Sequence, residues 1–115
     1  MRIVSLIIAV TLVTLTSCSR GPVITVKNRS SLTISNVVVS GSGFSERIGS
    51  IAAGGEHRLS IRLRGESGVC LMFDAGTQHV DSGEQGYFEA SGGYRVAATV
   101  ETNLSVSISS DLRQY

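Results

Sequence analysis

The sequence predicts an all-β protein, an antiparallel β-sandwich of about seven to nine short strands that follows an N-terminal signal peptide. Two observations predict this fold class. Beyond residue 20, apolar and polar residues alternate in short β-branched stretches, and no window keeps a helical period. Gly and Ser, which make up 29 of the 98 residues from Cys18 onward, separate these stretches. Many short strands between Gly- and Ser-rich turns are typical of a sandwich.

Nine stretches fit this strand pattern. They are residues 23–28, 32–40, 44–51, 57–64, 69–74, 77–81, 87–90, 94–101 and 104–110. Placing inward residues opposite one another predicts two hairpins. The first pairs Val96 with Ile108, Ala98 with Val106 and Val100 with Leu104, around a loop of residues 101–103 in which Asn103 takes the left-handed conformation. The second pairs Leu59 with Phe73, Ile61 with Leu71 and Leu63 with Val69.

Residues 1–17 have the features of a cleaved signal peptide. Arg2 is their only charge, and the apolar run of residues 3–13 is shorter than the roughly 20 residues that cross a bilayer. The segment Leu15-Thr16-Ser17-Cys18 resembles a bacterial lipobox. This resemblance implies a diacylglyceryl thioether on Cys18, cleavage before it and an added acyl chain such as palmitate on the new amine. Two or more chains anchor a protein stably.

The lipobox sets the expected domain organisation and location. Residues 18–22 form the lipidated Cys and a short tether, and residues 23–115 form the domain. Ser19, where the family has Asp for inner-membrane retention, favours the outer membrane with the domain facing the periplasm. The outer leaflet of the inner membrane and the cell surface remain alternatives. If an ordinary peptidase cuts instead, Cys18 is a free thiol that can pair with Cys70.

The first half of the domain resembles a recurrent bacterial Ig-like module. The matching stretches are Ile24-Thr25-Val26-Lys27-Asn28, Ile34-Ser35-Asn36-Val37-Val38-Val39 and Ile48-Gly49-Ser50-Ile51-Ala52-Ala53-Gly54-Gly55. Such modules serve in adhesion, scaffolding or assembly, which is what the resemblance implies here. The Trp and paired cysteines of antibody domains are missing from the sequence. The sequons at Asn28 and Asn103 are chance matches beside a lipobox.

Charge is balanced overall and uneven along the chain. Nine basic and nine acidic residues follow Cys18, which argues against nucleic-acid binding. Residues 20–64 carry seven basic and two acidic residues, and residues 65–115 carry two basic and seven acidic residues. The halves either neutralise each other by pairing across strands or, if they stay apart, favour head-to-tail association or docking onto a charged partner.

Three sets of residues are candidate partner-binding sites. Arg58, Arg62 and Arg64 form a row on one polar face, for which solvated edge protection is the alternative. A second set, Cys70 and Met72, lies on a strand that is apolar on both faces. A protein partner, arginine stems, the 87–88 segment or the C-terminal tail is expected to cover that second face. The third set is the aromatic pair Tyr87 and Phe88 in the turn-rich 81–89 segment. If these two side chains are exposed, we expect them to contact peptide or glycan; the alternative is that they are buried in the core.

No group of residues predicts catalysis or a cofactor. Gly41-Ser42-Gly43 lacks the spacing and the helix of a nucleophile elbow, and the sequence has two histidines. Asp74, His79, Asp81 and Glu84 are interpreted as a solvated acidic edge rather than a metal site. We therefore expect a non-catalytic membrane-anchored lipoprotein of binding or assembly type. The alternative is a small ligand-binding or enzyme-accessory lipoprotein, such as an inhibitor, that uses the 81–89 segment.

Overall fold

The computed structural model describes residues 21–112, and this part of the chain contains nine strands and no helix. The strands are β1 (Val23–Asn28), β2 (Ile34–Gly41), β3 (Phe44–Ile51), β4 (Glu56–Ser60), β5 (Glu66–Ala75), β6 (Gln78–Asp81), β7 (Gln85–Glu89), β8 (Arg95–Val100) and β9 (Val106–Asp111). Each of the nine predicted stretches overlaps one strand, and the all-β sandwich is confirmed. β1 and β3 have the predicted bounds, because Gly and Ser turns mark their ends.

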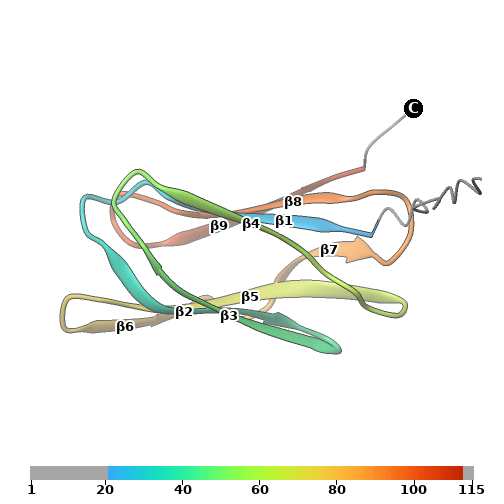
Figure 1. Ribbon diagram of the computed structural model, residues 1–115, viewed down its shortest axis with the longest axis horizontal. Helices are drawn as coiled ribbons and strands as arrows, with labels where there is room; N and C mark the ends of the chain where they lie inside the picture. The colour runs from blue at the N-terminus through green and yellow to red at the C-terminus, as the bar shows by residue number, and fades with distance from the viewer. Residues whose placement is uncertain (1–20, 113–115) are drawn as a thin grey trace, which may run out of the picture.

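The strands form two layers (Figure 1). The first sheet has the order β4-β1-β8-β9, and the second has the order β3-β2-β5-β6, with β7 pairing with β5 next to β6. One pairing is parallel, between β1 and β8. In antibody constant domains the first strand lies at a sheet edge, whereas here β1 lies inside its sheet between β4 and β8. The arrangement is thus a sandwich with its own strand order.

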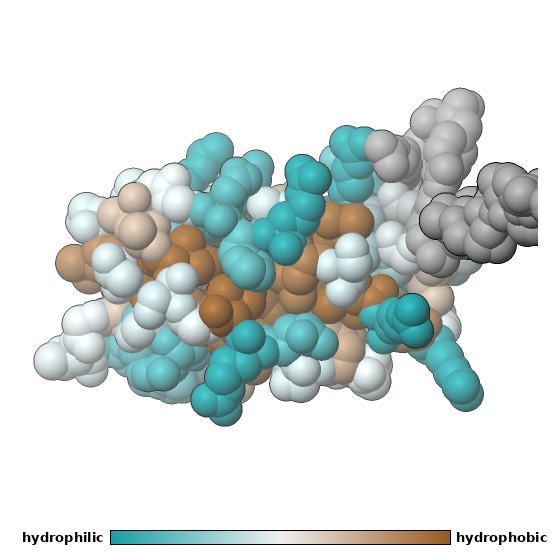
Figure 2. All heavy atoms as spheres, in the orientation of Figure 1, coloured by the Kyte–Doolittle hydropathy of each residue, from teal (hydrophilic) through white to brown (hydrophobic). Residues whose placement is uncertain are grey.

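The core lies between the two sheets and comes from the alternating residues of the central strands. In β1 and β8 every second residue is buried, which is the period expected of a strand with one wet face. The largest completely buried side chains are Phe73 and Phe88. Figure 2 shows apolar side chains in a band between the more polar outer surfaces of the two layers. The described strands therefore complete both sheets and a core by themselves.

The first predicted hairpin exists with a register shifted by two residues. Val100 pairs with Val106, and Ala98 pairs with Ile108. The loop is longer than predicted, and its left-handed residue is Leu104, at φ 69°, rather than Asn103. The side chain of Asn103 accounts for this loop conformation. Its Oδ1 accepts hydrogen bonds from the N–H and Oγ of Ser105 at 3.0 and 2.6 Å. A shift of two keeps the same side chains facing inward.

The second predicted hairpin, which paired residues 59–63 with 69–73, is wrong. β4 belongs to the first sheet, where Leu59 pairs with Ile24 of β1. β5 belongs to the second sheet, where Leu71 pairs with Val39 of β2. Residues 61–65 are the connection that crosses from one sheet to the other. Alternation identifies the inward face of a strand but does not say which sheet the strand joins, so both arrangements satisfy the pattern.

A buried asparagine closes the end of β1. The Nδ2 of Asn28 donates to the carbonyl oxygens of Leu32, Ile51 and Ala52 at 2.8, 3.1 and 3.2 Å. Its Oδ1 accepts from the N–H and Oγ of Ser30. Because Asn28 is buried, it has a structural role that the sequon interpretation missed.

Candidate functional site

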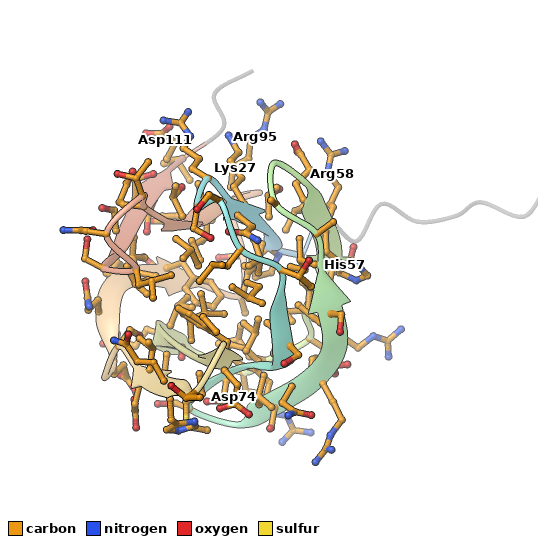
Figure 3. The ribbon with its side chains drawn as sticks, turned by 90° about the vertical axis from the view of Figure 1, so that its left-hand side faces the viewer. Lys27, His57, Arg58, Asp74, Arg95 and Asp111 are labelled. Carbon is orange, nitrogen blue, oxygen red and sulfur yellow. The ribbon has the colours of Figure 1, made fainter. Side chains whose placement is uncertain are left out.

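Four arginines line one open groove at the end of the sandwich where the chain enters β1. Arg58 comes from β4, Arg62 and Arg64 from the β4–β5 connection, and Arg95 from the start of β8. All four side chains are exposed. Figure 3 shows Arg58 and Arg95 projecting from the outer face of the first sheet. The predicted row of Arg58, Arg62 and Arg64 is therefore brought together, with a fourth arginine added.

The start of the domain forms part of the wall of this groove. Gly21, Pro22 and Val23 line it. Two backbone hydrogen bonds hold this segment in place: the Val23 N–H donates to the Tyr94 carbonyl at 3.0 Å, and the Ile61 N–H donates to the Pro22 carbonyl at 3.0 Å. Gly21 itself packs so closely that a Cβ there would lie 3.1 Å from the Ile61 carbonyl oxygen. The position of the groove relative to residue 21 is therefore fixed.

Within residues 21–112, no carboxylate lies within ion-pairing distance of the groove arginines. Neither Asp nor Glu is among the residues that line it. Across residues 21–112 the ion pair within 4.0 Å is that of His79 with Asp74, which lie on β6 and β5 and do not line the groove. Asp111 pairs with Arg95 across β8 and β9 without forming an ion pair. The remaining polar wall consists of hydroxyl groups such as those of Thr25, Ser60 and Ser91. Such a surface attracts anions.

The two oppositely charged halves of the chain stay apart in space. β4 and β1 lie next to each other in one sheet, and β3 and β2 do so in the other. The short 52–55 turn joins β3 to β4, so these four strands occupy one side of the sandwich, and β5–β9 occupy the other. Figure 3 shows the blue-to-green first half on the right and the yellow-to-red second half on the left. We call them the basic side and the acidic side.

Among the residues that the structure describes, no ion pair joins the basic side to the acidic side. The His79–Asp74 pair joins two residues of the acidic side. The alternative that the halves pair internally across strands is therefore not what the described residues show. Two acids, Glu46 and Glu56, lie on the basic side, and Arg95 stands at the boundary in β8.

Cys70 and Met72 lie on the outer face of the second sheet and are half-buried. In register, Cys70 pairs with Ser40, and Met72 pairs with Val38 and Asp81. The sheet neighbours therefore cover this face in part. Burial raises the pKa of the Cys70 thiol, and the Asp81 carboxylate, 3.4 Å from its Sγ, raises it further. Arg62 lies in the connection that precedes β5 and is not paired with Cys70 in the sheet.

The aromatic pair of the 81–89 segment is divided between surface and core. Tyr87 is 46% exposed, and Phe88 is completely buried. The Phe88 ring packs edge-on against Phe44 at 6.0 Å, and the Tyr87 ring packs edge-on against Tyr94 at 6.3 Å. The neighbouring Glu89 carboxylate raises the pKa of Tyr87 to about 12. Only Tyr87 of the two can contact a partner. The expectation that the core takes at least one of them is confirmed.

The acidic stretch holds hydrogen bonds rather than a ligand cluster. Asp74 Oδ1 lies 2.7 Å from His79 Nδ1, and Asp74 Oδ2 accepts from Asn36 Nδ2 at 2.9 Å. These two contacts lower the pKa of Asp74. Asp81 Oδ1 accepts from the Gly83 N–H at 2.9 Å. Within residues 21–112, no group of three or more Cys, His, Asp or Glu side chains has an arrangement that could hold a metal ion.

Two predictions lie outside the described residues: the signal peptide of residues 1–17 and the lipidation of Cys18. Within the described part, no helix is long and apolar enough to cross a membrane. The contribution of Arg95 to the groove was missed by sequence reasoning. Arg95 comes from the other half of the chain, and only the parallel pairing with Val23 brings it to this end. No local pattern could have indicated it.

Comparison with known proteins establishes the fold alone. No protein-family model matches the chain. No curated protein matches it either. The fold is similar to that of a protein from Eubacterium rectale whose structure was determined by NMR, with a TM-score of 0.53 and 15% sequence identity. The alignment covers 84% of this chain and 91% of that one.

Proposed function

We propose that the protein is a non-catalytic lipoprotein, anchored through Cys18 and periplasm-facing at the outer membrane, that binds or assembles with another protein. The observation that carries this proposal is the separation of a basic side and an acidic side that are not neutralised by ion pairs among residues 21–112. Such a surface gives complementary electrostatic attraction to a charged partner, which sets specificity and association rate.

The anchor is supported by the Leu15-Thr16-Ser17-Cys18 segment and by its distance from the domain. Replacing Cys18 with Ala in the full chain is expected to abolish incorporation of labelled palmitate and to release the domain into the soluble periplasmic fraction. The matched control is Cys70→Ala, which leaves labelling and membrane association unchanged. Persistent labelling or membrane association of Cys18→Ala contradicts the anchor.

The binding role is tested by cross-linking in cells from defined surface positions. A photo-activatable residue is placed at Arg47 on the basic side, at Glu84 on the acidic side, or, as a control, at Ser107, an uncharged exposed position of β9 that lies in the other sheet from the strands flanking Glu84. We expect one protein to be captured from a charged side, at a yield that falls as salt is raised, and not from Ser107. Capture at equal yield from all three positions, or from none, contradicts the proposal.

The alternative of a small ligand-binding or inhibitory protein using residues 81–89 has less support. Phe88 is in the core, and the arginine groove is lined by Tyr94 but by no residue of the 81–89 segment. A Tyr87→Ala variant that loses a cellular function while keeping its fold favours this alternative.

A further inference from the structure

We propose that the four-arginine groove binds the phosphate groups of anionic lipids in the membrane that carries the anchor. The ligand class is the phosphodiester of an acidic phospholipid head group. This inference rests on the proposed function for one point, the attachment of Cys18 to a bilayer. The groove is then a second membrane contact that fixes how the domain stands on the surface.

The first step is distance. Gly21 lines the groove, and Cys18 precedes it by three residues. Three fully extended residues span at most roughly 10 Å. The hydrogen bonds at Pro22 and Val23 hold the chain against the groove, so this short span cannot be lengthened by peeling the domain from its tether. A lipid on Cys18 therefore holds Gly21, and with it the rim of the groove, within roughly 10 Å of the membrane surface, which is about one Debye length.

The second step is chemistry. All four basic side chains of the groove are arginine, whose planar guanidinium donates two parallel hydrogen bonds to a phosphate. Serine and threonine hydroxyls that line the same groove are further donors to phosphate oxygens. Tyr94, half-buried in the wall, has an apolar ring and a polar end, which suits the boundary between head groups and acyl chains. The groove is open, as an extended surface of head groups requires.

The third step is the partner class. A soluble acidic protein could also meet four arginines, but the three-residue tether keeps the bilayer always near the groove, whereas such a partner must reach it by diffusion. A basic patch beside an acyl anchor is a known physical route to firm, oriented attachment. The acidic side, in β5–β9, then remains for the protein partner.

The test uses the domain alone, residues 19–115, because its described strands complete both sheets and a core. It has no Cys18, so its result is independent of lipidation. The domain is mixed with vesicles of phosphatidylcholine, with or without phosphatidylglycerol, and sedimented. Its nine basic and nine acidic residues leave no net charge to attract it. We expect it to sediment with the phosphatidylglycerol vesicles only, and less as salt is raised.

Two variants with equal loss of charge locate the binding. One carries Arg58→Ser, Arg62→Ser and Arg64→Ser in the groove. The other carries Lys27→Ser, Arg29→Ser and Arg47→Ser, at three positions that do not line the groove. We expect each groove arginine to contribute a factor of roughly five to binding and the second variant to bind like the original domain. Circular dichroism and urea unfolding verify that both variants are folded.

Three results would overturn the proposal. One is equal vesicle binding by the two variants. Another is a preference for inorganic phosphate, measured by amide NMR shifts, with no binding to phosphatidylglycerol vesicles, which would assign the groove to a soluble anion. The last is self-association in sedimentation velocity that the groove variant abolishes while vesicles are ignored, which would assign the groove to the acidic side of a second copy. In each case the Cys18→Ala fractionation still tests the anchor separately.

Discussion

Asn28 and Ser30 are joined by two hydrogen bonds, from the Ser30 N–H at 3.0 Å and from the Ser30 Oγ at 2.7 Å to the Asn28 Oδ1. Asn103 and Ser105 form the same pair near the other end of the chain. Both are Asn-x-Ser sequences, and both fold as side-chain-capped turns. The first is buried and the second exposed, so the pair provides a built-in comparison.

Replacing Asn28 with Ala is expected to lower the free energy of unfolding by about 3 kcal/mol. The loss is large because three backbone carbonyls lose a donor at a buried position. Asn103→Ala, at the exposed turn, is expected to lower it by about 0.5–1 kcal/mol. Urea unfolding of the 19–115 domain followed by circular dichroism measures both. Similar losses for the two variants would mean that burial of the Asn28 turn does not matter.

Phe88 and Tyr87 are adjacent in sequence and opposite in environment. Phe88→Ala leaves a cavity beside Phe44 and is expected to lower the free energy of unfolding by about 3–5 kcal/mol. Tyr87→Ala, on the exposed face, is expected to lower it by less than about 1 kcal/mol. Thermal or urea unfolding distinguishes these outcomes. If Tyr87→Ala destabilises the domain as much, its contact with Tyr94 is part of the core.

Cys70 is expected to react slowly with iodoacetamide at neutral pH. Burial and the Asp81 carboxylate both raise the pKa of its thiol, so little thiolate is present to react. Asp81→Asn is expected to increase the alkylation rate several-fold in the 19–115 domain, where Cys70 is the single cysteine. Mass spectrometry over a time course measures the rate, with Glu84→Gln as a control for loss of a nearby charge. A faster reaction than that of an unfolded cysteine peptide would contradict this account.

The contact of Asp74 with His79 is expected to make stability depend on pH. The pKa of Asp74 is lowered in the folded chain by hydrogen bonds from His79 and Asn36. A lowered folded-state pKa means that the ionised carboxylate stabilises the fold above the unfolded value near 3.8 and that this contribution is lost as the pH falls through the folded-state value. Asp74→Asn should therefore have a lower urea midpoint than the original domain at pH 6.

Acidification tests the direction of this effect. Below the folded-state pKa of Asp74, the urea midpoints of the Asp74→Asn variant and the original domain should converge. In His79→Ala, the NMR titration midpoint of the Asp74 carboxyl carbon should move up toward 3.8. If the difference in urea midpoint between the variant and the original domain grows on acidification, the effect has the opposite sign. That result would refute the stabilising role of the ionised Asp74 carboxylate.

Local sequence determined where most of the strands lie along the chain. It determined little about which strands pair with one another. β1 and β3 were predicted with their bounds because Gly, Ser and Asn residues mark where alternation stops. The pairing of Leu59 with Phe73 failed because alternation reports the inward direction, and both sheets share one core. The arginine row was visible because Arg58, Arg62 and Arg64 are close in sequence. Arg95 was not, because a pairing across about 70 residues leaves no local pattern.

The position of β1 between β4 and β8 has a consequence for the order of folding. During synthesis β1 emerges first, and one of its two hydrogen-bonding edges has no partner until residues 95–100 have also emerged. Pairings of such sequence separation form slowly because the loop entropy must be overcome first. The growing chain thus stays incompletely folded until it is nearly finished. Until then β1 has an open strand edge, which is a template for unwanted pairing with other chains.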